Sequence, residues 1–166
     1  MSSGKGLGIL ALLIGISGLG LGVYTVVFPK VDVKFGIQNT WFNYDTSVMG
    51  YATSPIGTDI VLDALTINFT VNSGESVYFL FNTFAVITGG SPGIIRIDFV
   101  LDGVKKVPPD YPEVIFQSDG TQYDTVTLQI AKIISTGFHN LTTVIYGNYA
   151  SNGIKDCTLL VQTFIP

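Results

Sequence analysis

The feature that most constrains this chain is an apolar run over residues 7–28 that contains no charged side chain. As a helix rising about 1.5 Å per residue, the run would reach roughly 33 Å, close to the thickness of the hydrocarbon core of a bilayer. We therefore expect a single transmembrane or core-forming helix over residues 7–28. A short cytoplasmic start over residues 1–6 precedes it, and a separately folded part over residues 30–166 follows.

Small residues form a stripe along this predicted helix. They recur at alternating spacings of four and three, as the a and d positions of a heptad do: Gly8, Ala11, Gly15, Gly18, Gly22 and Thr25. Small side chains let helix backbones approach closely, which is how helices associate in lipid, where no hydrophobic effect joins them. The stripe predicts a homo-oligomeric helix bundle. The alternative is that glycine is simply frequent in membrane helices.

The apolar run has other interpretations. A cleaved secretory signal peptide fits poorly, because the run exceeds the usual length of about 7 to 15 residues and no A-x-A-like site follows it. The short basic start ending in Lys5-Gly6 resembles the leader of archaeal pilins, whose apolar helices pack together in a filament. A membrane anchor and a filament core therefore both stay open, as does processing at Lys5-Gly6.

The residues that flank the apolar run only partly determine its orientation in a membrane. Lysines flank it on both sides, so the charge rule does not fix its orientation. Most of the chain follows the run and carries two N-x-T sequons, which make Asn68 and Asn140 candidate N-glycosylation sites. We expect the amino end to be cytoplasmic and residues 30–166 to be extracellular, at the cell membrane or cell surface.

Charge and cysteine content exclude several classes of function. The net charge is −4, so no basic patch is available to neutralise nucleic-acid phosphates. The single cysteine, Cys157, excludes an internal disulfide and a cysteine metal cluster, and we expect it to be a small core residue. About 135 residues after the run suit one domain.

The chain beyond Pro29 has the alternation of apolar and polar residues that is typical of β-strands. Strands are predicted over residues 31–38, 59–71, 76–88, 94–102, 104–107, 113–117, 123–134, 141–150 and 154–165. The segment 76–88 is apolar on both faces, which favours a central strand or one buried against another subunit. Asp102-Gly103 is a two-residue hairpin signal, and residues 108–112 form an exposed proline loop. The fold class is therefore all-β, a jelly-roll or β-sandwich domain of about nine strands preceded by one hydrophobic helix.

Two predictions concern the start of the β part. Within residues 31–38, Ile37 falls on the apolar face together with Val31, Val33 and Phe35. An aromatic cluster follows, and we expect it to cap the core in preference to lying at a membrane interface. Its members are Trp41, Phe42, Tyr44 and Tyr51.

No catalytic, cofactor or metal site is predicted. Ser91 lies in a G-x-S-x-G string, but a strand follows it where a nucleophile elbow requires a helix. His139, placed in a predicted turn, is the only histidine, so a second imidazole ligand is missing. Four acids carry the oxygen ligands that calcium prefers, but their spacing matches no calcium loop, and solvated turn acids are expected instead. They are Asp98, Asp102, Asp119 and Asp124.

Two apolar stretches carry a family resemblance, SGESVYFLFNTFAV over Ser73–Val86 and CTLLVQTF over Cys157–Phe164. With the preceding membrane helix, residues 60–166 resemble TNF- and C1q-like jelly-roll proteins in layout. The resemblance implies a trimer formed through apolar strand faces. The glycine-rich helix also resembles those of small surface proteins from archaea, including Asgard lineages.

Two functions fit these observations, and neither is enzymatic. In the first, the chain is a cell-surface structural or adhesion protein that is anchored by its helix and self-assembles into a homo-oligomer. In the second, it is a pilin-like subunit of an extracellular filament. The partners are therefore the chain itself, as a trimer or a helical filament, and membrane lipid through residues 7–28. Nucleic acid is excluded, and no external ligand is predicted.

Replacing Gly15 or Gly18 by Leu is expected to weaken the assembly, because a bulky side chain on the stripe holds the helix backbones apart. The measurement is the mass of the complex in detergent, with the unchanged protein beside it. A complex that keeps its full mass in both variants would show that the stripe does not join the helices.

Overall fold

A computed structural model describes residues 36–46, 51–52 and 57–166, and the regular secondary structure of this part consists of β-strands and one short 3-10 helix, Asp63–Leu65. Residues 1–6, the predicted helix over residues 7–28 and its stripe lie outside the described residues. Among the helices of the described part, none has the length and apolar character needed to cross a membrane.

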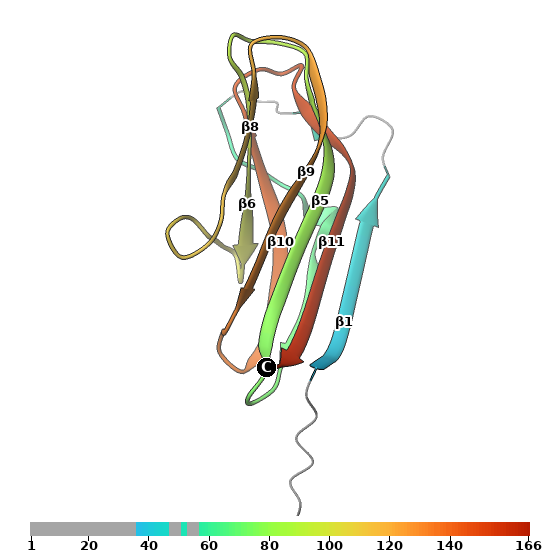
Figure 1. Ribbon diagram of the computed structural model, residues 1–166, viewed down its shortest axis with the longest axis vertical. Coiled ribbons are helices and arrows are strands. Elements are labelled where there is room, and N and C mark those ends of the chain that lie inside the picture. Colours follow the sequence, from blue (N-terminus) through green and yellow to red (C-terminus); the bar gives the residue numbers. More distant parts are fainter. Residues whose placement is uncertain (1–35, 47–50, 53–56) are drawn as a thin grey trace, which may run out of the picture. The chain divides into compact units, whose positions relative to one another are not determined.

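Two antiparallel sheets make up the fold (Figure 1). One has the strand order β1 (Gly36–Asp45), β11 (Gly153–Ile165), β5 (Ser76–Ile87) and β9 (Gln122–Lys132), with the short β2 (Tyr51–Ala52) also paired to β11. The other has β10 (Gly137–Gly147) and β6 (Gly93–Leu101) at its centre, flanked by β3 (Ile60–Val61), β4 (Ile67–Val71), β7 (Val104–Lys105) and β8 (Val114–Ser118). In Figure 1 the first sheet is the front layer, and β6 and β10 lie behind it.

The eight longer strands follow the order of a jelly roll. The chain passes between the sheets from β1 to β4, β5 and β6, continues in the second sheet to β8, and then passes to β9, β10 and β11. The result is the pair of four-stranded sheets β1-β11-β5-β9 and β4-β10-β6-β8, as in double-sheet jelly rolls. The predicted all-β jelly-roll or β-sandwich fold is therefore confirmed for the described residues.

The core lies between the two sheets and is rich in aromatic rings. Phe79 of β5 is fully buried, and its ring centroid lies 5.8 Å from that of Phe69 on β4 and 5.8 Å from that of Phe99 on β6, both edge-on. Such pairs contribute about 0.5–1.5 kcal/mol beyond the burial of area. Phe79 therefore joins the two sheets as well as filling space between them.

The first strand differs from the prediction. β1 continues to Asp45, beyond the predicted end at residue 38, while residues 31–35 lie outside the described part. An irregularity in the pairing of β1 with β11 falls between Ile37 and Asn39. Because an extra residue there shifts the alternation of side chains, Ile37 is 61% exposed instead of sharing an inward face.

The predicted strand over residues 59–71 is also wrong in detail, because it is divided into β3, a 3-10 turn and β4. Both strands pair with β10. The alternation within β4 is nevertheless intact, so that Ile67 and Phe69 are buried, and Leu65 of the 3-10 helix is buried as well.

Other predictions are confirmed. Asp102 and Gly103 both have positive φ, 54° and 72°, as a two-residue hairpin turn requires. β5 is a central strand between β11 and β9. Its inward residues are buried, and most of its outward residues are half-buried.

Phe79→Ala is expected to lower the free energy of unfolding by about 3–5 kcal/mol, because it removes a buried ring that contacts both sheets. The matched control is Ile115→Ala, at a β8 side chain that is 55% exposed, where the expected loss is below about 1 kcal/mol. Urea unfolding measures both. Equal losses in the two variants would contradict the assigned core.

Candidate functional site

The candidate site is the outer side of the five-stranded sheet, here called the low-charge face. Strand pairing arranges its outward residues in cross-strand rows. From the end that carries Pro166, the rows are Ile37–Phe164–Ser76, Thr40–Gln162–Tyr78–Ala131, Phe42–Leu160–Leu80–Gln129, Tyr44–Thr158–Asn82–Thr127, Lys155–Phe84–Thr125 and Gly153–Val86–Tyr123. Lys155 is the one charged residue in these rows.

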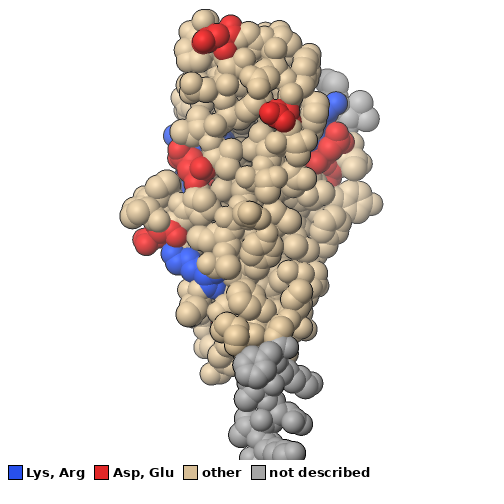
Figure 2. Space-filling view, viewed as in Figure 1, with Lys and Arg blue, Asp and Glu red and all other residues tan. Residues whose placement is uncertain are grey.

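The low-charge face differs from an ordinary solvated sheet surface. Figure 2 looks onto it, and the acidic and basic side chains lie along its margins and in the upper part of the view, while the central and lower part shows neither. Leu80 and Leu160 are half-buried at its centre. Aromatic enrichment together with loss of charge is the composition that marks the centre of a protein interface.

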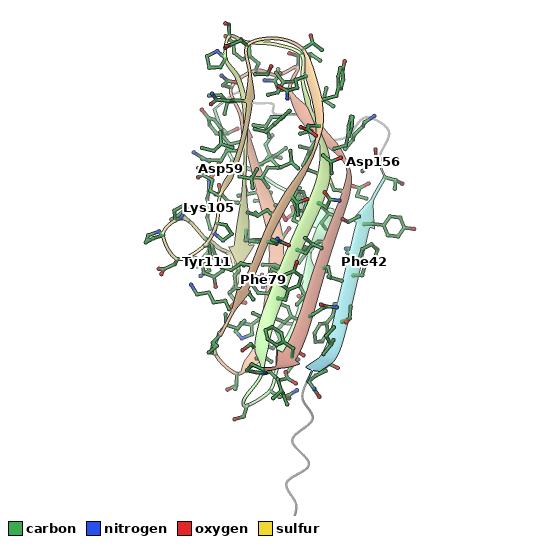
Figure 3. All side chains as sticks on the ribbon, viewed as in Figure 1. Phe42, Asp59, Phe79, Lys105, Tyr111 and Asp156 are labelled. Atoms are coloured by element: carbon green, nitrogen blue, oxygen red, sulfur yellow. The ribbon has the colours of Figure 1, made fainter. Side chains whose placement is uncertain are left out.

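Aromatic pairs occupy both sides of the face. On β1, the rings of Phe42 and Tyr44 stack with centroids 6.1 Å apart, and Phe42 is labelled in Figure 3. On β5 and β9, the rings of Phe84 and Tyr123 stack with centroids 6.3 Å apart. The Nζ of Lys155 lies 5.0 Å from the Phe84 centroid, so the one charge in the rows rests on an aromatic ring.

Polar groups on the face hydrogen-bond to one another across strands. The hydroxyl of Tyr78 donates to Oε1 of Gln129 at 2.6 Å, and Oγ1 of Thr127 donates to Oδ1 of Asn82 at 3.2 Å. These bonds do not depend on water. If another molecule covered the face, these side chains would therefore keep a hydrogen-bond partner, and the cost of burying them would be reduced.

The aromatic cluster predicted to cap the core is divided between the two sides of β1. Trp41 points inward, with its ring centroid 5.9 Å from that of Phe69. Phe42 and Tyr44 are 59% and 61% exposed, so the prediction is wrong for them. Alternation along β1 turns Trp41 inward and places Phe42 and Tyr44 on the low-charge face, where they pair with Leu160 and Thr158 of β11. The side chain of Tyr51 lies outside the described part.

The outer side of the other sheet is charged. Asp98 is only 1% exposed. Its Oδ2 atom lies 3.0 Å from Nζ of Lys105 and 3.3 Å from Nε of Arg96. The same Lys105 contacts Asp59 at 2.7 Å, and Figure 3 shows these two residues on the side of the sandwich away from β1. Burial opposes the charge on Lys105, but hydrogen bonds to Asp59 and Asp98 raise its pKa. The expectation that Asp98 is a solvated acid is therefore wrong, because it is buried beneath two cations.

His139 is also placed differently from the prediction, since it lies within β10 and is 6% exposed. Its Nδ1 is 2.8 Å from Oδ2 of Asp102, and its Nε2 is 2.8 Å from the carbonyl oxygen of Ser135. Burial opposes protonation, but the hydrogen bonds to these two acceptors raise the pKa of His139. Both ring nitrogens thus face acceptors, which favours the imidazolium form.

Ser91 and His139, the two residues that a serine hydrolase would need close together, lie far apart. Nδ2 of Asn148, just past the end of β10, donates to the carbonyl oxygen of Pro92, which places the Ser91 loop at that end. His139 lies near the opposite end of β10, roughly 25 Å away along the strand. Among the described residues, no group of three or more His, Cys, Asp or Glu side chains is arranged to hold a metal ion.

The structure also places Cys157 and the asparagines of the two sequons. Cys157 is a buried core residue, as predicted, and burial raises the pKa of its thiol to about 11. Asn68 and Asn140 are paired across β4 and β10, on the outer side of the six-stranded sheet. A glycan on either would therefore lie on the side away from the low-charge face.

No protein-family model and no curated protein matches the chain. Similar solved structures include dimeric latent PorU from Porphyromonas gingivalis, with TM-score 0.42 and 8% identity over 80% of this chain. The chain spans only 13% of the PorU chain. A family 35 carbohydrate binding module from an environmental isolate has TM-score 0.34 and 12% identity, over 77% of this chain and 88% of the module. Carbohydrate-binding module CBM36, in complex with calcium and xylotriose, has TM-score 0.33 and 14% identity, over 78% and 93%.

The stability contributed by His139 is expected to fall as the pH rises. Because its pKa is raised above the usual 6.5 in the folded state, the contribution is fully present below pH 6.5 and is lost as the pH rises through the folded-state pKa. The measurement is the free energy of unfolding between about pH 5 and pH 9.

The control for this pH dependence is Asp102→Asn, which suits the positive φ of the turn but removes the carboxylate. The fall in stability above pH 6.5 should be smaller in this variant. A fall of unchanged size would show that the ion pair with Asp102 is not its source.

Proposed function

We propose that this protein is a non-enzymatic structural or adhesion protein of the cell surface, anchored by residues 7–28, that self-assembles into a homo-oligomer through the low-charge face. The observation that carries the proposal is the set of cross-strand rows in which Lys155 is the one charged residue. The charge-free run over residues 7–28 supports the anchor and the external location.

The low charge of the face suits a contact between identical copies. Two chains of net charge −4 repel each other, so they associate best through a surface that adds no further like charge. The charged cluster of Asp59, Asp98, Lys105 and Arg96 lies on the opposite sheet, away from such a contact.

The size of the face also suits an interface. Four strands spaced about 4.8 Å apart and about ten residues long cover roughly 600 Å² of flat surface. Stable protein interfaces bury about 800 Å² of accessible surface on each partner. Side-chain relief makes the accessible area of a sheet larger than its flat area, so this face is of the required order.

Electron microscopy separates the anchored oligomer from the pilin-like filament. Protein released from its cells is imaged in negative stain with and without mild detergent. Discrete particles that appear only with detergent are the expected result for a membrane anchor. Long fibres that persist in detergent would replace the proposed anchor by a filament core.

Leu80→Lys is expected to raise the dissociation constant of the oligomer at least about tenfold, or about 1.4 kcal/mol, because it places an unpaired charge at the centre of the contact. Phe42→Lys tests the same face at a more exposed position. Light scattering of the detergent-solubilised protein measures the mass as a function of concentration.

The matched control is Ile115→Lys, at an exposed apolar residue of β8 on the other sheet. This variant should keep the mass of the unchanged protein. Thermal unfolding checks that all three variants are folded. If folded Leu80→Lys and Phe42→Lys both keep the full mass, the low-charge face does not mediate assembly.

A further inference from the structure

We propose that two copies in the same membrane pair side by side, with their low-charge faces in contact about a twofold axis parallel to the strands. This inference rests on the proposed function, from which it takes the anchor and the use of the face. It adds the orientation of the second copy and the residues that meet.

The first step concerns the end of the sandwich from which the anchor extends. Gly36, the first described residue of β1, pairs with Ile165, so the described chain starts and ends at the same end of the sandwich. Figure 1 marks the C-terminus there. Residues 29–35 separate the apolar run from Gly36 and can span at most about 25 Å. The chain thus joins the anchor at the end of the sandwich that carries Gly36 and Pro166, and the proposed pair has this end towards the membrane.

The second step concerns the place of the face on the sandwich. The low-charge face extends along the strands, from the Ile37 row near the membrane-facing end to the Tyr123 row near the other end. It is thus a side of the sandwich. Copies that meet tip to tip across two membranes would touch through the far loops, such as residues 88–92 and 148–152. A side face instead suits a neighbour anchored in the same membrane.

The third step follows from symmetry. Two copies in one membrane have the same end towards it, so a twofold axis that relates them runs along the membrane normal and hence along the strands. Such an axis leaves positions along the strands unchanged. Each row therefore meets the same row of the second copy, wherever the axis crosses the sheet, and the twist of packed sheets reduces the match only away from the axis.

The rows are complementary under this rule. With the axis between β11 and β5, Leu160 meets Leu80 of the second copy in the aliphatic row. Phe164 meets the small Ser76, and Lys155 meets the ring of Phe84 of the second copy. Aliphatic side chains thus meet in the central row, a large side chain meets a small one near the Pro166 end, and the one charge in the rows gains a second aromatic partner.

The test is crosslinking of single-cysteine variants of the full-length protein in liposomes. Tyr78→Cys, Asn82→Cys and Phe84→Cys place a thiol in three rows of β5 that span roughly 20 Å. A bismaleimide with a reach of about 10 Å matches the spacing of packed sheets. Cys157 is buried with a pKa of about 11, so the unchanged protein is the background control, and Ile115→Cys on β8 is the control for the other sheet.

The expected result is a crosslinked dimer in all three β5 variants, with yields that agree within about twofold, and none in the two controls. If the row order were reversed, with the axis at Asn82, two Tyr78 positions would lie roughly 26 Å apart along the strand. Yields would then fall steeply away from one row.

Each contrary outcome identifies what fails. Crosslinks confined to one row, in protein that keeps its oligomeric mass, overturn the parallel pairing while the proposed self-assembly stands. The mass of a trimer overturns the twofold axis. Crosslinks through Ile115→Cys alone overturn the use of the low-charge face. A monomeric unchanged protein overturns the proposed function itself.

Discussion

The double pairing of β5 is the constraint on which the rest of this structure depends. β5 hydrogen-bonds along its length to β11 on one side and to β9 on the other, so its backbone is satisfied and both of its surfaces are fixed. The inward rings of Phe79 and Phe81 enter the core. The side chains of Tyr78, Leu80 and Phe84 alternate with these rings, and they consequently lie on the low-charge face.

Charge is divided between the two outer surfaces of the sandwich. The six-stranded sheet carries Asp98 beneath Lys105 and Arg96, an arrangement in which a buried carboxylate is stabilised by two cations. The five-stranded sheet carries neutral polar groups bonded to one another, as between Tyr78 and Gln129. Covering the five-stranded sheet would therefore cost less desolvation than covering the six-stranded sheet, which is why the proposed self-assembly uses the low-charge face.

Part of the candidate site could be predicted from the sequence. The two-sided apolar pattern of residues 76–88 predicted β5 as a central strand or an interface strand, because no solvated strand has that composition. The contribution of Phe42 and Tyr44 was missed because the predicted strand ended at residue 38, whereas β1 continues to Asp45 and its alternation turns both rings outward. The burial of Asp98 and His139 was also missed, because their partners Lys105 and Asp102 come from other positions along the chain.

The sequence by itself determined the all-β class, the hairpin at Asp102-Gly103 and the inward residues of most strands, because alternation and turn chemistry are local properties. It also determined the low charge of the chain. The tertiary structure alone decided which strands are neighbours. Rows such as Phe42–Leu160–Leu80–Gln129 join residues more than a hundred positions apart, and only the pairing of β1, β11, β5 and β9 brings them onto one surface.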